Sequence, residues 1–100
     1  MCCITHPFVV KSFLHRGLKD LFETGRSAKV RPDLIERCCD RLKVIHAARN
    51  LNDLAIPGFD CHPLRGTKPR RHAIKVSGPW RITFEWRNGN VLRVDLEQYH

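Results

Sequence analysis

The spacing of apolar residues changes along this 100-residue chain, and that change restricts the fold more than any other feature. Before residue 50 the apolar residues recur at every third or fourth position, as on one face of an α-helix. After residue 73 they alternate with polar residues, as in strands that are buried on one face. Asn88-Gly89 separates the last two alternating runs and favours a tight β-hairpin turn. The sequence therefore predicts an α+β fold, with two N-terminal helices packed on a small antiparallel sheet.

Two apolar stripes mark the expected helices. The first starts at Leu14 and ends before Gly25, because glycine tolerates the left-handed conformation at a helix end. The second follows Pro32, which fits the first turn of a helix. We expect a short strand at residues 11–13 and a loop at residues 50–60. The expected core residues are Leu14, Leu18, Leu21, Phe22, Leu34, Ile35, Cys38, Leu42, Ile45, Ile74, Val76, Trp80, Ile82, Phe84, Trp86, Leu92, Val94 and Leu96.

The length of the chain suits one core, since a chain of this size buries roughly two-thirds of its unfolded surface. We expect residues 10–100 to form a single domain, and residues 1–9 to be an extension that a mis-assigned start adds. The sequence contains neither a long apolar run nor a signal sequence, which predicts a cytoplasmic protein without a membrane contact. The five cysteines are an odd number, and we expect them to be reduced thiols.

The net charge of +8 points to a polyanionic partner, because cations placed near phosphates release counterions. No acidic residue lies between Cys61 and Phe84 in the sequence, so we expect one face of the protein to be strongly positive. The residues expected to contact RNA or a ribosome without reading its sequence are Lys68, Arg70, Arg71 and Lys75.

His62 and Arg81 are the first candidates for chemistry. Strand alternation places Arg81, with Thr83, Glu85 and Arg87, on the sheet face opposite the apolar residues. His62 precedes a basic loop, and imidazole titrates near neutral pH, which suits general acid–base catalysis. For each residue taken singly, a solvated arginine or a structural histidine is the alternative.

Two other kinds of site are disfavoured. Cys61, His62 and His72 do not have the spacing of a known zinc finger, so we expect no metal and no cofactor. A nucleophilic Cys61 activated by His62 is unfavourable, because neighbours on a strand point to opposite faces.

Several motifs together resemble the HigB family of bacterial toxins, within the RelE/ParE superfamily. The similarity extends over residues 10–100. It is carried by the run from Val10 to Lys19, by Phe22-Glu23-Thr24-Gly25, by His62-Pro63-Leu64-Arg65-Gly66, by Trp80-Arg81-Ile82-Thr83-Phe84 and by the ending Glu97-Gln98-Tyr99-His100. The resemblance implies a compact RelE-like fold, similar to microbial ribonucleases. It also implies the toxin of a type II toxin-antitoxin system, a ribosome-dependent mRNA endoribonuclease that inhibits translation. The implied partners are a HigA-type helix-turn-helix antitoxin, the ribosome and mRNA.

The resemblance also assigns residues. The active-site histidine of the family falls on His62, its neighbouring lysine on Arg65 and its strand arginine on Arg81. The terminal tyrosine and histidine fall on Tyr99 and His100. We expect metal-free cleavage of a phosphodiester with His62 and His100 as acid and base, in an order left open. Arg81 and Arg65 would stabilise phosphate charge, and Tyr99 would orient the substrate.

Three positions depart from the family pattern. Pro79 replaces a frequent asparagine, Ser77 replaces an arginine of some members, and Arg65 replaces lysine with a different donor geometry. The changes at Pro79 and Ser77 remove possible substrate contacts. The alternative function is therefore a ParE-like gyrase inhibitor or a catalytically weakened nucleic-acid-binding toxin. A plain basic nucleic-acid-binding domain is a third hypothesis.

Overall fold

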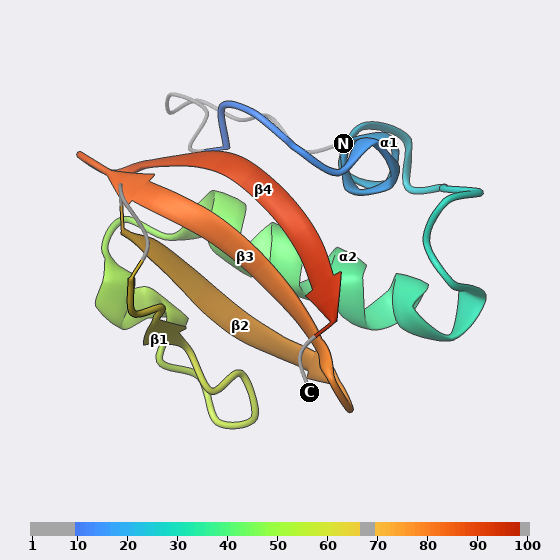
Figure 1. Cartoon of the computed structure of the whole chain (residues 1–100). Helices are drawn as coiled ribbons and strands as arrows, with labels where there is room; N and C mark the ends of the chain where they lie inside the picture. The colour runs from blue at the N-terminus through green and yellow to red at the C-terminus, as the bar shows by residue number, and fades with distance from the viewer. Residues whose placement is uncertain (1–9, 67–69, 99–100) are drawn as a thin grey trace.

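A computed structural model describes residues 10–66 and 70–98, and within these ranges two α-helices precede a four-stranded sheet (Figure 1). The elements are α1 (Arg16–Thr24), α2 (Pro32–Ala47), a 3₁₀ helix (Leu51–Leu54) in the expected loop, β1 (His62–Pro63), β2 (Arg71–Ser77), β3 (Trp80–Arg87) and β4 (Asn90–Gln98). Neighbouring strands are antiparallel and follow the order β1-β2-β3-β4. The predicted α+β fold is confirmed.

The core lies between the helices and one face of the sheet. Helix α2 packs on β2, and α1 packs on α2 and β4; in Figure 1, α2 crosses behind the strands. Gly25 ends α1 with a φ of 78°, and Pro32 is the first residue of α2, as predicted. The fully buried side chains include Leu18, Leu42, Ile45, Ile82 and Phe84. None of the described helices is long and apolar enough to span a bilayer.

The start of α1 differs from the prediction. Leu14 lies before the helix and is 53% exposed, because residues 10–15 run along the edge of β4 instead. Val10 and Phe13 form parallel bridges to Val91 and Val94, close to the short strand expected at residues 11–13. His15 then caps α1, since its Nδ1 accepts a hydrogen bond from the Leu18 N–H at 3.1 Å.

The apolar alternation in β4 also differs from the prediction. Val91, and not Leu92, belongs to the core. The reason is a β-bulge: Thr83 pairs with Asp95 but Glu85 pairs with Leu92, and Arg93 between them has a φ of 53°. One extra residue reverses the faces on either side of it. The hairpin turn itself is as predicted, with positive φ at Asn88 and Gly89.

Candidate functional site

Strand pairing aligns side chains in rows across the sheet face that the helices leave open. Residues directly opposite each other on neighbouring strands share a face. In the described strands, the successive rows are Arg71, Glu85 and Leu92; then His62, Ala73, Thr83 and Asp95; then Lys75, Arg81 and Glu97. Rows two residues apart along a strand are separated by about 7 Å. The predicted open-face positions of Arg81, Thr83 and Glu85 are therefore confirmed.

His62 is half-buried on the short edge strand β1, and its ring is held by the backbone. Nδ1 lies 2.7 Å from the carbonyl oxygen of Asp60, in the turn that precedes the strand. Because a carbonyl oxygen only accepts hydrogen bonds, Nδ1 carries the proton in this contact. A neutral His62 therefore has its basic lone pair on Nε2, as a general base requires.

Arg81 is fixed by the turn between β2 and β3. Its Nη1 donates to the carbonyl oxygens of Gly78 at 2.7 Å and Trp80 at 3.0 Å. A guanidinium has five N–H donors, so these contacts orient the group and leave donors for a ligand. Pro79 lies in this turn and not inside a strand, where proline would remove a ladder hydrogen bond.

Thr83 connects two charged neighbours in the middle of the face. Its hydroxyl donates to a carboxylate oxygen of Glu97 and accepts from Arg71 Nη2 at 2.9 Å. Glu97 was not among the site residues predicted from the sequence. The only available signal was its place in the terminal motif, because the partner of a β4 residue depends on a register that the bulge shifts.

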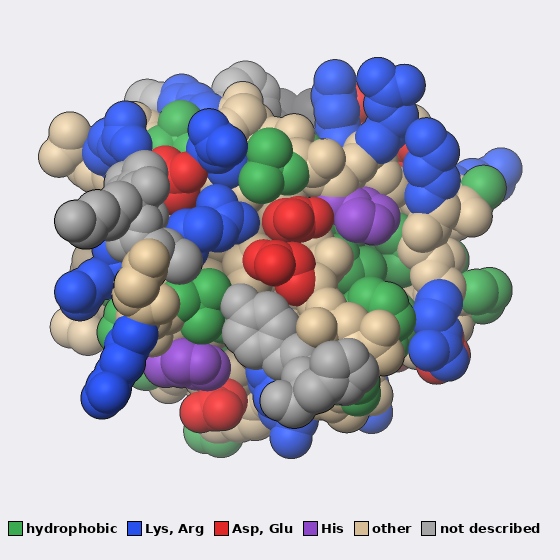
Figure 2. Space-filling model, in the orientation of Figure 1, with side chains coloured by type: hydrophobic (Ala, Val, Ile, Leu, Met, Phe, Trp, Pro, Cys, Tyr) green, Lys and Arg blue, Asp and Glu red, His purple; other side chains and the backbone are tan. Residues whose placement is uncertain are grey.

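The open face is mixed in charge, so it is not the strongly positive face that the charge distribution predicts. Glu85, Asp95 and Glu97 all lie on it. Figure 2 shows acidic side chains in the middle of this face, with Lys and Arg side chains around them. The acidic residues of β3 and β4 thus meet the basic residues of β2 and β3 across the strands.

The remaining predicted residues occupy different environments. Arg65, Arg70 and Lys75 are exposed. The guanidinium of Arg71 is largely buried and contacts Glu85, Thr83 and the Arg93 carbonyl oxygen. Lys68, Tyr99 and His100 lie outside the described residues; the last described residue, Gln98, pairs with Trp80, next to Arg81.

Cys61 and His72 do not join His62 in one cluster. His72 pairs with Pro63 and stacks on the core residue Phe84, on the helix side of the sheet. Burial raises the pKa of the Cys61 thiol, and the nearby Asp60 carboxylate adds to this, which disfavours the thiolate. Within the described ranges, no three His, Cys, Asp or Glu side chains are placed to hold a metal ion.

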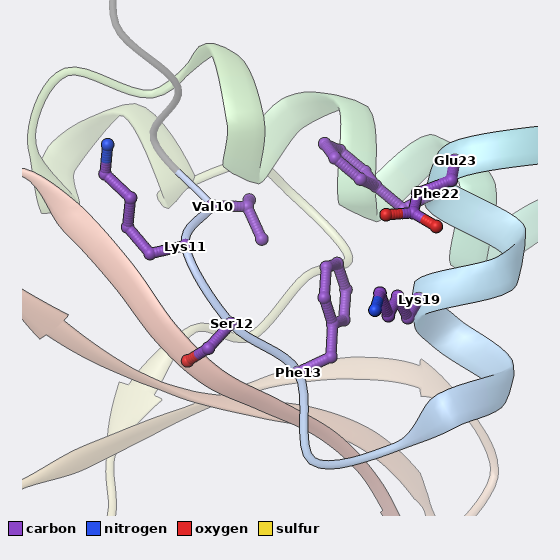
Figure 3. Close-up of a pocket in the computed structure, with 7 residues that line it drawn as sticks. All are labelled: Val10, Lys11, Ser12, Phe13, Lys19, Phe22 and Glu23. Atoms are coloured by element: carbon purple, nitrogen blue, oxygen red, sulfur yellow. The ribbon is translucent and has the colours of Figure 1, made fainter.

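A pocket of about 520 Å³ lies between residues 10–13 and α1, apart from these rows. Figure 3 shows the rings of Phe13 and Phe22 side by side at this pocket, and their centroids are 5.5 Å apart. The described residues that line it are Val10, Lys11, Ser12, Phe13, Lys19, Phe22 and Glu23. They include none of the predicted site residues.

An antiparallel sheet covered by helices on one face, with His62 and Arg81 on the other, defines a small RelE-like α+β protein. The chain belongs to the HigB-like toxin family: the sequence model of the RelE-like toxin of type II toxin-antitoxin system HigB matches residues 11–100. A relative from Proteus vulgaris, named Endoribonuclease HigB, is 38% identical over 92 residues, which cover 92% of this chain and 100% of the relative. The family resemblance drawn from the motifs is confirmed.

Proposed function

We propose that this toxin is an endoribonuclease that cleaves mRNA on the ribosome and thereby inhibits translation. One observation carries the proposal: His62, with its Nδ1 held by the Asp60 carbonyl, shares an open polar face with the oriented guanidinium of Arg81. The identity to a relative named an endoribonuclease supports it, as does the net charge of +8.

The proposed reaction is an internal phosphoryl transfer. The 2′-oxygen of the RNA forms a bond to the adjacent phosphorus while the bond from phosphorus to the 5′-oxygen breaks. A base removes the 2′-hydroxyl proton, and an acid donates a proton to the leaving 5′-oxygen. We assign these tasks to His62 and His100, with either residue as the base, so that the chemistry is metal-free.

Cations complete the proposed mechanism. Arg81 and Arg65 stabilise the charge that develops on the phosphate oxygens, because prearranged donors lose little energy in reorganising. Tyr99 orients the substrate or stacks on a base. Lys68, Arg70, Arg71 and Lys75 contact RNA or the ribosome without reading sequence, with Arg71 acting from its largely buried position.

The partner of this toxin is an antitoxin, as the type II family requires. We propose that it is a HigA-type helix-turn-helix protein and that both act in the cytoplasm. Co-purification of the two proteins from a co-expressing strain, followed by their separation in denaturant, tests the pairing.

Mapping of mRNA 5′ ends on purified translating ribosomes tests the activity. We expect His62→Ala, His100→Ala and Arg81→Ala each to reduce cleavage by about 100-fold or more. Arg26→Ala is the matched control, since Arg26 is an exposed cation in the connection between α1 and α2. Undiminished cleavage by the double variant His62→Ala/His100→Ala would contradict the assignment. Inhibition of gyrase supercoiling without RNA cleavage would favour the ParE-like alternative.

A further inference from the structure

We propose that three arginines around Glu85 form a second binding site for the RNA backbone, at the end of the sheet where β3 turns into β4. This arginine cluster consists of Arg71, Arg87 and Arg93, all within the described residues. The inference rests on the proposed function, because it takes RNA as the ligand.

Glu85 holds the cluster together from a nearly buried position. Its side chain is 6% exposed. Oε2 contacts Arg71 Nη1 at 3.6 Å and Arg93 Nε at 3.2 Å, and Oε1 contacts Arg87 Nη2 at 3.3 Å. The three guanidiniums come from β2, β4 and β3, so one carboxylate positions cations from three strands.

The bulge in β4 brings Arg93 to this face. In regular alternation the residue after Leu92 would point toward the helices, but Arg93 adopts a φ of 53°, which L-residues rarely do. Its N–H donates to Ser12 Oγ at 2.8 Å, and the next N–H, of Val94, donates to the Ser12 carbonyl at 3.1 Å. The Arg93 carbonyl in turn accepts from Arg71 Nη2 at 2.9 Å. Hydrogen bonds with Ser12 and Arg71 thus stabilise the unusual backbone conformation of Arg93.

One arginine is enough to balance the negative charge of Glu85, and the cluster contains three. Arg71, with a side chain 15% exposed, is enough to neutralise one carboxylate. The side chains of Arg87 and Arg93 are 59% and 60% exposed, and they contact Glu85 through Nη2 and Nε respectively. An outward pair of guanidinium forks matches the geometry of phosphate oxygens.

The position of the cluster fits a strand of RNA that crosses the open face. Its row, with Arg71 and Glu85, is adjacent to the row of His62 and Thr83, about 7 Å away along the strands. Figure 2 shows Lys and Arg side chains gathered at this end of the face, at the left of the view. Because Arg87 and Arg93 lie on β3 and β4, two and three strands from β1, a phosphate bound there would lie farther along the same RNA strand than the one beside His62.

Binding of a fully 2′-O-methylated single-stranded RNA oligonucleotide tests the proposal, because it has no free 2′-hydroxyl and cannot be cleaved. Arg87→Gln/Arg93→Gln keeps hydrogen-bonding side chains beside Glu85 but removes two charges. We expect weaker binding, with the slope of log K against log salt reduced by about 1.4, or 0.7 for each lost contact. Arg26→Gln/Lys43→Gln removes two exposed charges from the α1–α2 connection and α2, and should keep the wild-type slope.

If the double variant does not fold, the single variant Arg87→Gln replaces it, because this change breaks only one exposed ion pair. It should lower the slope of log K against log salt by about 0.7. A parallel titration with vacant ribosomes distinguishes the source of the phosphate. Weaker binding of the variant to the oligonucleotide assigns the site to the substrate strand. Weaker binding to ribosomes, with unchanged binding to the oligonucleotide, assigns it to ribosomal RNA. Wild-type slopes in both titrations would overturn the proposal. A wild-type protein that binds RNA but does not cleave mRNA contradicts the proposed function and not this site.

Discussion

His62 and His72 lie on neighbouring strands but have opposite environments, because the pleat directs them to different sides of the sheet. The ring of His62 is on the open face and is oriented by a carbonyl oxygen. The ring of His72 stacks on Phe84, with centroids 5.9 Å apart, and its Nδ1 is buried without a hydrogen-bond partner in the described structure. Burial lowers the pKa of His72, and the charges of Arg70 and His62 lower it further.

This difference predicts a loss of stability in mild acid. Because the pKa of His72 in the folded protein is below its ordinary value of 6.5, the unfolded chain binds the proton first as the pH falls. The contribution of His72 to stability is therefore complete above pH 6.5 and declines below it. Urea unfolding at about pH 7.5 and about pH 5, where carboxylates of ordinary pKa stay ionised, measures the decline. His72→Phe keeps a ring on Phe84 and should reduce it; an equal decline in both proteins would contradict the explanation.

The helices and strands were predictable wherever the apolar residues are regularly spaced. They were not predictable where the backbone departs from regular helix or strand geometry. The stripe of α2 and the apolar residues of β3 lie in or against the core as predicted. Leu92 does not, because the bulge at Arg93 reverses the alternation and a non-glycine residue gives no warning of positive φ. Leu14 does not either, because the chain pairs with β4 at this point and α1 starts only at Arg16, with His15 as an unusual N-cap residue.

Gly17, in the first turn of α1, is expected to reverse the usual effect of replacing a helical glycine. Alanine normally stabilises a helix relative to glycine by about 1 kcal/mol. A Cβ at position 17 would lie 2.7 Å from His15 Cε1 and 2.9 Å from Lys29 Cβ, so the capping ring would have to move. We expect Gly17→Ala to destabilise the fold by about 1–2 kcal/mol in urea unfolding. Lys19→Ala, at an exposed position of α1, should be nearly neutral; a more stable Gly17→Ala protein would contradict the packing described.

The molecule as a whole has a net charge of +8, yet carboxylates lie in the middle of its open face. Alternation placed Arg81 correctly on that face, since the apolar pattern of its strand is readable from the sequence. The contacts of Thr83 with Glu97, and of Glu85 with three described arginines, were not predictable. They join residues on different strands, and their partners depend on a register that one inserted residue changes.

The position of the last described residue predicts unequal effects of terminal fusions. Gln98 pairs with Trp80, beside Arg81, and the proposed roles of Tyr99 and His100 follow directly in the sequence. A tag fused after His100 should therefore reduce mRNA cleavage more than the same tag fused before Met1. Cleavage assays on ribosomes with both fusions measure the difference. Two equally active fusions would show that His100 is not catalytic in this protein.

The hydrogen bond from Arg93 to Ser12 joins residues 81 positions apart, so it can form only after most of the chain has been synthesised. The edge of β4 holds residues 10–15, and the open face lacks Asp95, Glu97 and Arg93 until β4 exists. Released chains that end before β4 should therefore be digested by protease as unfolded protein, whereas released chains of full length should resist. Completion of the open face is therefore one of the last steps in the folding of this toxin.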